Sequence, residues 1–346
     1  MKDEGEEEGV GFWVLGVREE SVLNQHPAPS TQHPTPSTQH PTPSYRGRVA
    51  PSPTGYLHLG HARTFWTAHV RARAAGGVLV LRDEDLDPAR SRAQFAAAML
   101  EDLRWFGLEW QEGPDVGGPF APYRQSERRG LYLGAWARLV EGGHVYPCAC
   151  SRRDIARAAE APHEGQAGAR QAQDDEPHYP GTCRPRAGTV LQAPSSPAGL
   201  NWRFRVPDGE ALVFEDLQQG RQSFVPGRDF GDFVVWRRDD VPAYQLAVVV
   251  DDAHMQITEV VRGADLLKST ARQMLLQRAL GLPTPAHLHC DLVTDERGER
   301  LAKRHQSLSL RALRAAGRTP AEVRASFAAG GPGAGPTSLT TGGSGI

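Results

Sequence analysis

The stretch YRGRVAPSPTGYLHLGHARTFWTAHVRARAAGGVLVLRDEDLD, residues 45–87, decides the fold of this chain. Tyr45–Ala50 is typical of a short strand, and the Pro/Gly-rich run Pro51–Gly55 is typical of a turn. Apolar residues then recur at helical spacing as far as Gly76, and Val78–Leu81 is the apolar run of a buried strand. A strand, a helix and a strand within about 40 residues predict a βαβ unit, and hence a parallel sheet with a right-handed crossover.

Similar patterns extend over the rest of the chain and predict an α/β protein with a Rossmann-like, doubly wound parallel sheet. We expect helices at about 91–106, 125–142 and 265–280, and strands at Trp202–Val206, Phe233–Arg237 and Tyr244–Val250.

Changes in composition predict the domain organisation. We expect two halves of the Rossmann-like domain, residues 45–145 and 225–318, with residues 146–224 as an insertion and connecting region. Residues 1–44 are acidic, and residues 25–45 contain the repeat QHPAPST-QHPTPST-QHPTPSY, whose proline content is incompatible with helix or sheet. Residues 319–346 are rich in small and polar residues. We expect both of these terminal segments to be disordered.

Length and charge narrow the range of functions. The chain has 346 residues and a net charge of −2, of which residues 1–44 contribute −5, so the remainder is mildly basic at +3. Such a balance is compatible with contact to a nucleic acid over a limited patch. No apolar run approaches the ~18 residues that span a bilayer, and acidic residues precede Val10–Val17 where a signal peptide has basic ones. We therefore expect a soluble, cytoplasmic protein without a membrane partner.

The loop between the first strand and the first helix carries the first candidate site. His58 and His61 lie three residues apart at a helix start and therefore face the same way. Gly55 and Gly60 allow the backbone to approach a ligand, and this edge of a parallel sheet is where phosphates bind to helix N-termini. Two imidazoles directed at one phosphate can stabilise the charge that develops during attack on phosphorus. Taken alone, two histidines near a turn are ordinary surface residues, and only their position favours the phosphate hypothesis.

Three of the four cysteines form a second candidate site. Cys148 and Cys150 are separated by one residue, and Cys183 follows in the Gly/Pro-rich stretch 179–183. Three thiolates in a segment with little core of its own predict one structural Zn²⁺, which needs a fourth ligand. His178 is the chemically ordinary choice. Cys290 has no partner in the sequence, and we expect it in the core.

The segments RVAPSPTGYLHLGHART and LRDEDLD together resemble the catalytic domain of class I glutamyl-tRNA synthetases, with His58–His61 in the place of the HIGH signature. The similarity continues through FVVWRRDDVPAYQLAVVVDDA and ITEVVRGADLL and covers roughly residues 45–305. It is specific because several separated motifs agree in order and spacing. The resemblance implies the Rossmann-like fold of a class I aminoacyl-tRNA synthetase with a zinc-bearing insertion.

The resemblance also implies which residues bind the substrates. An arginine can bind a side-chain carboxylate through two hydrogen bonds, and an acid can pair with an α-ammonium group. The residues implied for L-glutamate are Arg48, Val49, Ala50, Pro51, Ser52, Glu84, Tyr244 and Arg262. Those implied for ATP are His58, Gly60, His61 and Lys303, and His58, His61 and Lys303 are also implied to be catalytic.

Two of these implied sites depart from the family pattern. The segment ERLAKR, residues 299–304, resembles the mobile KMSKS loop, but Arg300 replaces the first Lys and Ala302 replaces the Ser. In the cysteine cluster, the family nominates Tyr179 as the fourth ligand to Cys148, Cys150 and Cys183, and His178 remains the alternative.

Only 42 residues follow Arg304, and many of them are low-complexity, so we expect no anticodon-reading region of the kind that full-length glutamyl-tRNA synthetases carry. Together with the CxC…YxxxC pattern, this resembles the glutamyl-Q tRNA(Asp) synthetase family. That family implies a ligase that converts L-glutamate and ATP, with Mg²⁺, to glutamyl-AMP without tRNA. The glutamyl group is then transferred to the queuosine base in the anticodon loop of tRNA(Asp).

Two alternatives stay open, and the sequence does not decide between them. Besides the glutamyl-Q hypothesis, these are a minor or truncated glutamyl-tRNA synthetase that charges a tRNA 3′ end, and a zinc-containing tRNA-binding protein whose catalysis has lapsed. The altered loop at Arg300 and Ala302 motivates the second alternative. We expect a monomer, and the segment 151–178 carries arginines that can meet phosphate or solvent equally well.

Overall fold

The computed structural model describes residues 45–151, 153–155, 178–186, 189, 194–292 and 309–328, and it begins with the βαβ unit that the sequence predicts. This unit consists of β1 (Arg46–Val49), α1 (Leu59–Ala74) and β2 (Val78–Leu81), and the two strands pair in parallel. The return from α1 to β2 runs tightly past the start of β1, since a Cβ at Gly77 would lie 2.4 Å from the carbonyl oxygen of Tyr45. Only glycine permits this approach.

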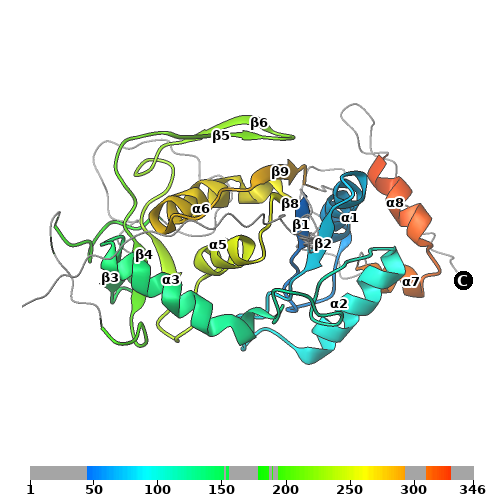
Figure 1. Cartoon of the computed structure of the whole chain (residues 1–346), viewed down its shortest axis with the longest axis horizontal. Coiled ribbons are helices and arrows are strands. Elements are labelled where there is room, and N and C mark those ends of the chain that lie inside the picture. The colour runs from blue at the N-terminus through cyan, green and yellow to red at the C-terminus, as the bar shows by residue number, and fades with distance from the viewer. Residues whose placement is uncertain are drawn as a thin grey trace, which may run out of the picture. The chain divides into compact units, whose positions relative to one another are not determined.

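Four further strands complete the main sheet, whose order is β2-β1-β8-β9-β5-β6 (Figure 1). All neighbours in it pair in parallel except β5 and β6, which form an antiparallel hairpin. The prediction of a Rossmann-like, mainly parallel sheet is confirmed. The bounds are Leu212–Asp216 for β5, Gly220–Phe224 for β6, Glu259–Gly263 for β8 and Ala286–Cys290 for β9.

A second, antiparallel sheet has the order β3-β4-β7. Its core includes three tryptophans: the ring centroid of Trp136 lies 5.1 Å from that of Trp202 and 6.5 Å from that of Trp236. The strands are β3 (Val145–Cys148), β4 (Asn201–Phe204) and β7 (Phe233–Trp236).

The helices cover these sheets, and none of those in the described part of the chain is long and apolar enough to cross a membrane. The α-helices are α2 (Ala93–Phe106), α3 (Arg129–Glu141), α5 (Tyr244–His254), α6 (Leu267–Leu280), α7 (Leu310–Ala315) and α8 (Pro320–Ala328). Two short 3₁₀ helices, η1 (Gln125–Arg128) and η2 (Ala264–Leu266), precede α3 and α6.

The strand predicted at Tyr244–Val250 is wrong, because these residues belong to helix α5. Every residue from Leu246 to Asp252 is buried, since α5 packs against α3, α6 and β7. A helix that is buried on all sides has no polar face to reveal its 3.6-residue period. The β-branched run Val248–Val250 therefore favoured a strand from the sequence, and tertiary packing overrides that propensity.

Two expectations about the domain boundaries also need correction. β5 and β6 come from the region 146–224, which we assigned to the insertion, yet they extend the main sheet. Conversely, β7 comes from the expected second half of the Rossmann-like domain and joins the smaller sheet. Within the expected disordered segment 319–346, residues 320–328 form helix α8, because Val323 is buried in the same core cluster as α1 and α2.

Candidate active site and metal-ligating cluster

The two histidines predicted to face a phosphate lie side by side at the start of α1. His58 is the N-cap residue, and its ring stacks on that of His61 with 3.7 Å between the centroids. Nδ1 of His58 accepts the backbone N–H of Gly60 at 3.2 Å, and Nδ1 of His61 faces the backbone N–H of His58 at 3.5 Å. A backbone N–H can only donate, so each neutral ring carries its proton on Nε2. Both Nε2–H groups are therefore donors for a ligand.

The surroundings keep this pair of histidines neutral. Burial lowers the pKa of His58. The ring of His61 is partly accessible, but the protein crowded around it and the neighbouring His58 lower its pKa as well. The first turn of α1 contains no acidic residue, which leaves the positive end of the helix dipole free for an anion.

The side chains expected to bind glutamate come from the carboxyl ends of neighbouring strands. Arg48 lies on β1 and Arg262 on the adjacent β8, and Glu84 follows β2. Tyr244 is the first residue of α5. Arg48 and Tyr244 are both close enough to Arg262 to affect its pKa, and Arg48 likewise affects that of Glu84. The structure thus brings these four side chains together at one edge of the sheet, where ligands of such folds bind.

A buried carboxylate lies between two arginines in this pocket. Oδ1 of Asp252 lies 3.6 Å from Nε of Arg48 and 2.6 Å from Nη1 of Arg82. Arg82 is fully buried and also binds Oε1 of Glu84 at 2.9 Å through Nη2. Burial acts to raise the pKa of Asp252, but Arg82 and Arg48 outweigh it, so the pKa lies below its usual value. The ionised Asp252 therefore forms an ion pair with Arg48, whose Nη1 donates to the carbonyl oxygen of Val261 at 3.0 Å. Arg82 fixes Glu84.

Backbone hydrogen bonds connect the segment that follows Arg48 with the residues directly after β2. The N–H of Arg82 donates to the carbonyl oxygen of Val49 at 2.9 Å, and the N–H of Glu84 donates to that of Pro51 at 2.9 Å. Of the other residues implied for the substrates, Ala50 and Gly60 are half-buried and Ser52 is exposed.

Arg262 is buried and held by three side chains. Nε donates to Nε2 of His289 at 3.1 Å. Nη1 donates to Gln273 at 2.9 Å and Nη2 to Thr270 at 2.5 Å. Burial lowers the pKa of Arg262, and Tyr244 acts against this effect.

Lys303, together with Arg300 and Ala302, lies outside the described residues. Beyond that segment, the chain lies against the histidine-bearing loop. The N–H of Leu310 donates to the carbonyl oxygen of Leu57 at 2.7 Å, and Ser309 forms an isolated bridge with His58. Ser309 and Leu310, which are six and seven residues after Lys303 in the sequence, are therefore anchored beside Leu57 and His58.

The three predicted cysteines form a compact cluster. The Sγ atoms of Cys148, Cys150 and Cys183 all lie within 4.8 Å of one another. The hydroxyl of Tyr179 is 3.4 Å from Sγ of Cys148 and 3.8 Å from Sγ of Cys150, and it accepts the backbone N–H of Cys183 at 2.8 Å. Three soft sulfur donors and one oxygen that converge in this way fit a four-coordinate metal ion such as Zn²⁺.

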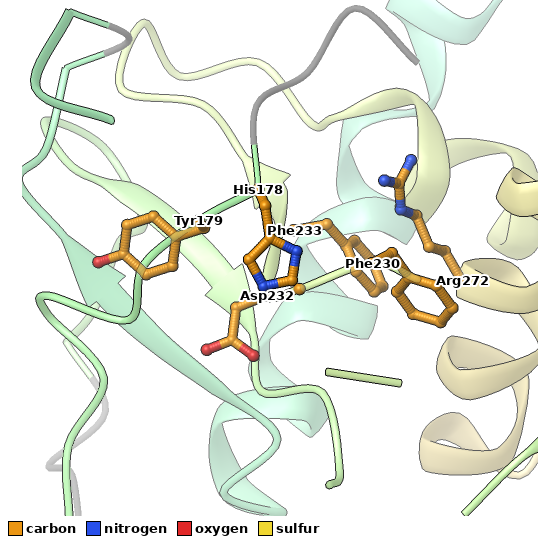
Figure 2. Close-up of a pocket in the computed structure, with 7 residues that line it drawn as sticks. His178, Tyr179, Phe230, Asp232, Phe233 and Arg272 are labelled. Atoms are coloured by element: carbon orange, nitrogen blue, oxygen red, sulfur yellow. The ribbon is translucent and has the colours of Figure 1, made fainter. Parts of the chain in front are cut away.

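His178, the alternative fourth ligand, is directed elsewhere. It lines a small pocket with Phe230, Asp232 and Arg272, and the hydroxyl of Tyr179 points away from it (Figure 2). Among the described residues, the group of potential metal-ligating side chains around Cys148 contains no histidine. The geometry therefore favours Tyr179 over His178.

A buried arginine accompanies the cluster. The guanidinium of Arg203 lies 3.9 Å from the ring centroid of Tyr179, and its Nε donates to Sγ of Cys148 at 3.4 Å. Its Nη1 is held by the carbonyl oxygen of Asp232 at 2.9 Å. Arg203 therefore packs against both Cys148 and Tyr179 and links the cluster to the backbone at Asp232.

Several residues of the site escaped the sequence analysis, namely Arg82 as an organising residue, Arg203, Asp216, Asp252 and His289. One signal was available for Asp252, since two consecutive acids inside the apolar run LAVVVDDA are unlikely to be buried without partners. Oδ2 of Asp216 lies 2.5 Å from Nδ1 of His289. The sequence offers no signal for this contact, because it depends on the pairing of β5 with β9.

Comparison with known proteins gives one family match. Residues 44–331 match the family described as "tRNA synthetases class I (E and Q), catalytic domain". Two relatives named glutamyl-Q tRNA(Asp) synthetase are similar over 80% of this chain and 83% of their own length. The protein of Symbiobacterium thermophilum is 52% identical and that of Nitratidesulfovibrio vulgaris 49%.

Longer synthetases are also similar to this chain. The glutamate–tRNA ligase 2 of Acidithiobacillus ferrooxidans is 46% identical over 81% of this chain and 56% of its own length. A solved glutamate-tRNA synthetase of Elizabethkingia anophelis superposes with a TM-score of 0.64 at 32% identity, covering 75% of this chain and 52% of that one. The chain thus spans about half the length of these two proteins.

Proposed function

This chain belongs to the class I tRNA synthetase family of the glutamate and glutamine type, and from that premise we propose that it activates L-glutamate with ATP and transfers the glutamyl group to the queuosine base in the anticodon loop of tRNA(Asp). The arrangement that carries the proposal is the histidine pair at the N-terminus of α1 beside two buried arginines at the same sheet edge. One half can bind a phosphate, and the other can bind a carboxylate.

In the activation step, a carboxylate oxygen of the glutamate α-carboxyl group attacks the α-phosphorus of ATP. The bond from this phosphorus to the oxygen of the leaving pyrophosphate breaks, and glutamyl-AMP forms. The Nε2–H groups of His58 and His61 donate to the phosphate oxygens as negative charge develops there. Because both rings are neutral donors, no proton needs to move from them.

The pocket selects glutamate by charge. Arg262 and Arg48 face the side-chain carboxylate, and Glu84 pairs with the α-ammonium group. An uncharged side chain would leave a buried guanidinium without its anion, and such sites discriminate strongly. Tyr244, which is 37% exposed, closes the pocket beside Arg262.

Lys303 binds the β- and γ-phosphates in this proposal, by its resemblance to the second Lys of the KMSKS loop. Mg²⁺ enters with ATP as part of the substrate and neutralises phosphate charge. Cys148, Cys150, Tyr179 and Cys183 would hold one structural Zn²⁺, and these residues come from the end of strand β3 and from the segment around Cys183.

The first test is glutamate-dependent ATP–pyrophosphate exchange on the full-length protein, with and without tRNA. We expect exchange in both conditions. Labelled glutamate is then offered with tRNA(Asp) containing queuosine, tRNA(Asp) lacking it, and tRNA(Glu). We expect label only on the first, and we expect it to stay on the anticodon fragment after nuclease cleavage.

A second candidate function is charging of a tRNA 3′ end, which the similarity to the glutamate–tRNA ligase of Acidithiobacillus ferrooxidans favours. Exchange that requires tRNA, together with label on the 3′ fragment of tRNA(Glu), would establish this candidate instead. No exchange in either condition would show that the chain does not catalyse activation.

A further inference from the structure

A line of buried side chains runs from the β5–β6 hairpin to Arg262. Asp216 is the last residue of β5 and lies opposite His287 of β9 in the main sheet. Its Oδ2 is 2.5 Å from Nδ1 of His289, and both side chains of this pair are 0% exposed. On the other side of the ring, Nε2 of His289 receives Nε–H of Arg262 at 3.1 Å.

These contacts determine which nitrogen of His289 carries the proton. Nε of Arg262 can only donate, so Nε2 of His289 must be the acceptor. The proton of the neutral ring then lies on Nδ1 and is donated to Asp216. Burial and the nearby Arg262 lower the pKa of His289 to about 4, which keeps the ring neutral.

The backbone keeps Asp216 ionised. Its Oδ1 accepts the N–H groups of Gln218 at 3.0 Å, Gln219 at 2.8 Å and His289 at 3.1 Å. Burial acts to raise the pKa of Asp216, but these N–H groups and the His289 side chain outweigh it, and the pKa lies below its usual value. Oδ2 is therefore a charged acceptor for the Nδ1–H of His289.

The line of contacts restricts how Arg262 can turn. A guanidinium has five N–H groups in one plane. Three of those of Arg262 are used by His289, Gln273 and Thr270. The other two remain for Tyr244 and for a carboxylate, and the plane in which they lie is set by these three bonds together, of which the bond from Nε to His289 is one.

We propose that Asp216 and His289 are positioning residues for the amino-acid substrate: they hold the guanidinium of Arg262 in the orientation that receives the glutamate side-chain carboxylate. The inference rests on the proposed function, in which Arg262 binds glutamate. It gives the β5–β6 hairpin, which lies outside the βαβ unit, a role in substrate binding.

The decisive variant is Asp216→Asn, because the structure dictates how asparagine must sit. Its amide oxygen has to occupy the place of Oδ1, where three backbone N–H groups need an acceptor. The NH₂ group then faces Nδ1 of His289 and forces the proton of the ring onto Nε2. Nε2 can then no longer accept Nε–H of Arg262 and donates instead to Oγ1 of Thr270, 3.0 Å away. One of the three bonds that orient the guanidinium is lost while the turn after β5 is retained.

In ATP–pyrophosphate exchange we expect Asp216→Asn to raise the KM for glutamate about 10- to 100-fold, as the loss of one hydrogen bond to a charged group does. The KM for ATP should stay within about twofold of the wild-type value. The matched control is Asp291→Asn, since Asp291 binds the side chains of Gln218 and Gln219 on the exposed side of the same turn. This control should leave both KM values unchanged.

A second pair of variants tests the histidine itself. Gln at position 289 can place its carbonyl oxygen near the position of Nε2, whereas Leu offers no acceptor. We therefore expect His289→Gln to retain much of the affinity for glutamate that His289→Leu loses. In ¹⁵N NMR spectra of the wild-type protein, the His289 ring should show the Nδ1-protonated tautomer, and in Asp216→Asn the Nε2-protonated one.

Three results would overturn the inference: an Nε2-protonated ring in the wild type, a glutamate KM in Asp216→Asn equal to that of Asp291→Asn, or a fall in kcat with no change in KM. If Asp216→Asn does not fold, the histidine variants decide: equal glutamate KM values for His289→Gln and His289→Leu would overturn the inference. Arg262→Ala separates this failure from a failure of the proposed function. If Arg262→Ala leaves the glutamate KM unchanged, Arg262 does not bind glutamate and the proposed pocket itself is wrong.

Discussion

At the scale of single residues, the backbone around the start of α1 decides how His58 and His61 can act. Their Nδ1 atoms face backbone N–H groups, so the available donors are Nε2–H groups on neutral rings. Protonation would add a proton at Nδ1 and oppose those backbone groups. The pair is thus built to stabilise a phosphate by hydrogen bonding over the whole neutral pH range rather than as a pair of cations.

Asp83 is a second residue whose surroundings give a measurable consequence. It is 3% exposed, and its Oδ1 has no hydrogen-bond partner within the described part of the chain. Its Oδ2 lies 3.9 Å from Nε of Arg124, too far for a hydrogen bond. Burial and the nearby Asp85 raise the pKa of Asp83 to about 7.

We predict that the free energy of unfolding contains a term from Asp83 that increases as the pH falls from 8 to 5.5. Between pH 8 and 5.5, Asp83 takes up a proton in the folded state. In the unfolded state its carboxyl pKa is about 3.9, so the group stays ionised. Lower pH therefore favours folding. The increase should be about 2 kcal/mol. Asp83→Asn, which is neutral in both states, should remove it.

Urea unfolding at pH 8 and pH 5.5 measures the effect. The quantity of interest is the difference between wild type and Asp83→Asn at each pH, since other titrating groups cancel in that difference. Glu109→Gln, at a side chain that is 74% exposed, is the control and should give the same difference at both pH values. A wild-type-minus-variant difference that does not change with pH would contradict the prediction.

At the scale of elements, helix α8 is held to the core by one arginine as well as by apolar contacts. Nη1 of Arg324 donates to the carbonyl oxygen of Phe106 at the end of α2, at 2.7 Å. Its guanidinium also lies 4.6 Å from the ring centroid of Trp66 on α1. Arg324 therefore satisfies a helix C-terminus and stacks on an aromatic ring at the same time.

We predict that Arg324→Ala lowers the free energy of unfolding by about 1–2 kcal/mol and makes α8 more sensitive to proteolysis. Arg324→Lys should recover only part of this loss, because an ammonium group cannot stack as a planar guanidinium does. Urea unfolding and limited digestion with chymotrypsin, which can cut after Phe327 in α8, measure the two effects. The exposed Arg318 provides the control Arg318→Ala, and equal stability of the two alanine variants would refute the role of Arg324.

The elements also show what a sequence can and cannot predict. The βαβ unit was predictable because a turn-rich loop and a helical period separate two apolar runs within 45–87. Helix α5 was not, because burial on all sides erases its period. For the site, the place of His58 at a helix start could be predicted from the residues around it, whereas Glu84 was named by the resemblance to the family. The partners of Asp252 and His289 could not be predicted from the sequence, because these contacts join distant segments of the chain.

At the scale of the whole molecule, the cysteine cluster substitutes for a core in the part of the chain that carries it. The buried apolar residues there form a small separate cluster of Tyr146, Cys148, Ile155 and Tyr179. Such a small cluster supplies little hydrophobic stabilisation, and a structural metal commonly provides what is missing.

We predict that the purified protein contains about one zinc ion per chain, in line with a structural site, and that Cys183→Ala loses most of it. Metal analysis by mass spectrometry measures the content, and thermal unfolding with and without a chelator should show a lower transition temperature for the stripped protein. Cys290→Ala is the matched control, since Cys290 is a buried thiol outside the cluster. Full zinc content in Cys183→Ala would rule out the proposed ligand set.

The order of strands in the main sheet has a consequence for biosynthesis. In the sheet, β1 lies between β2 and β8. β2 follows β1 closely in the sequence, but β8 comes much later: Val261 of β8, which accepts a hydrogen bond from Arg48 of β1, is 213 residues further along the chain. At a translation rate of ~5–20 residues per second, one edge of β1 waits about 10–40 s for its partner to emerge from the ribosome. An open strand edge is a template for pairing with other chains. The interval between β1 and β8, rather than the stability of the finished sheet, therefore governs how exposed this protein is to aggregation while it is being made.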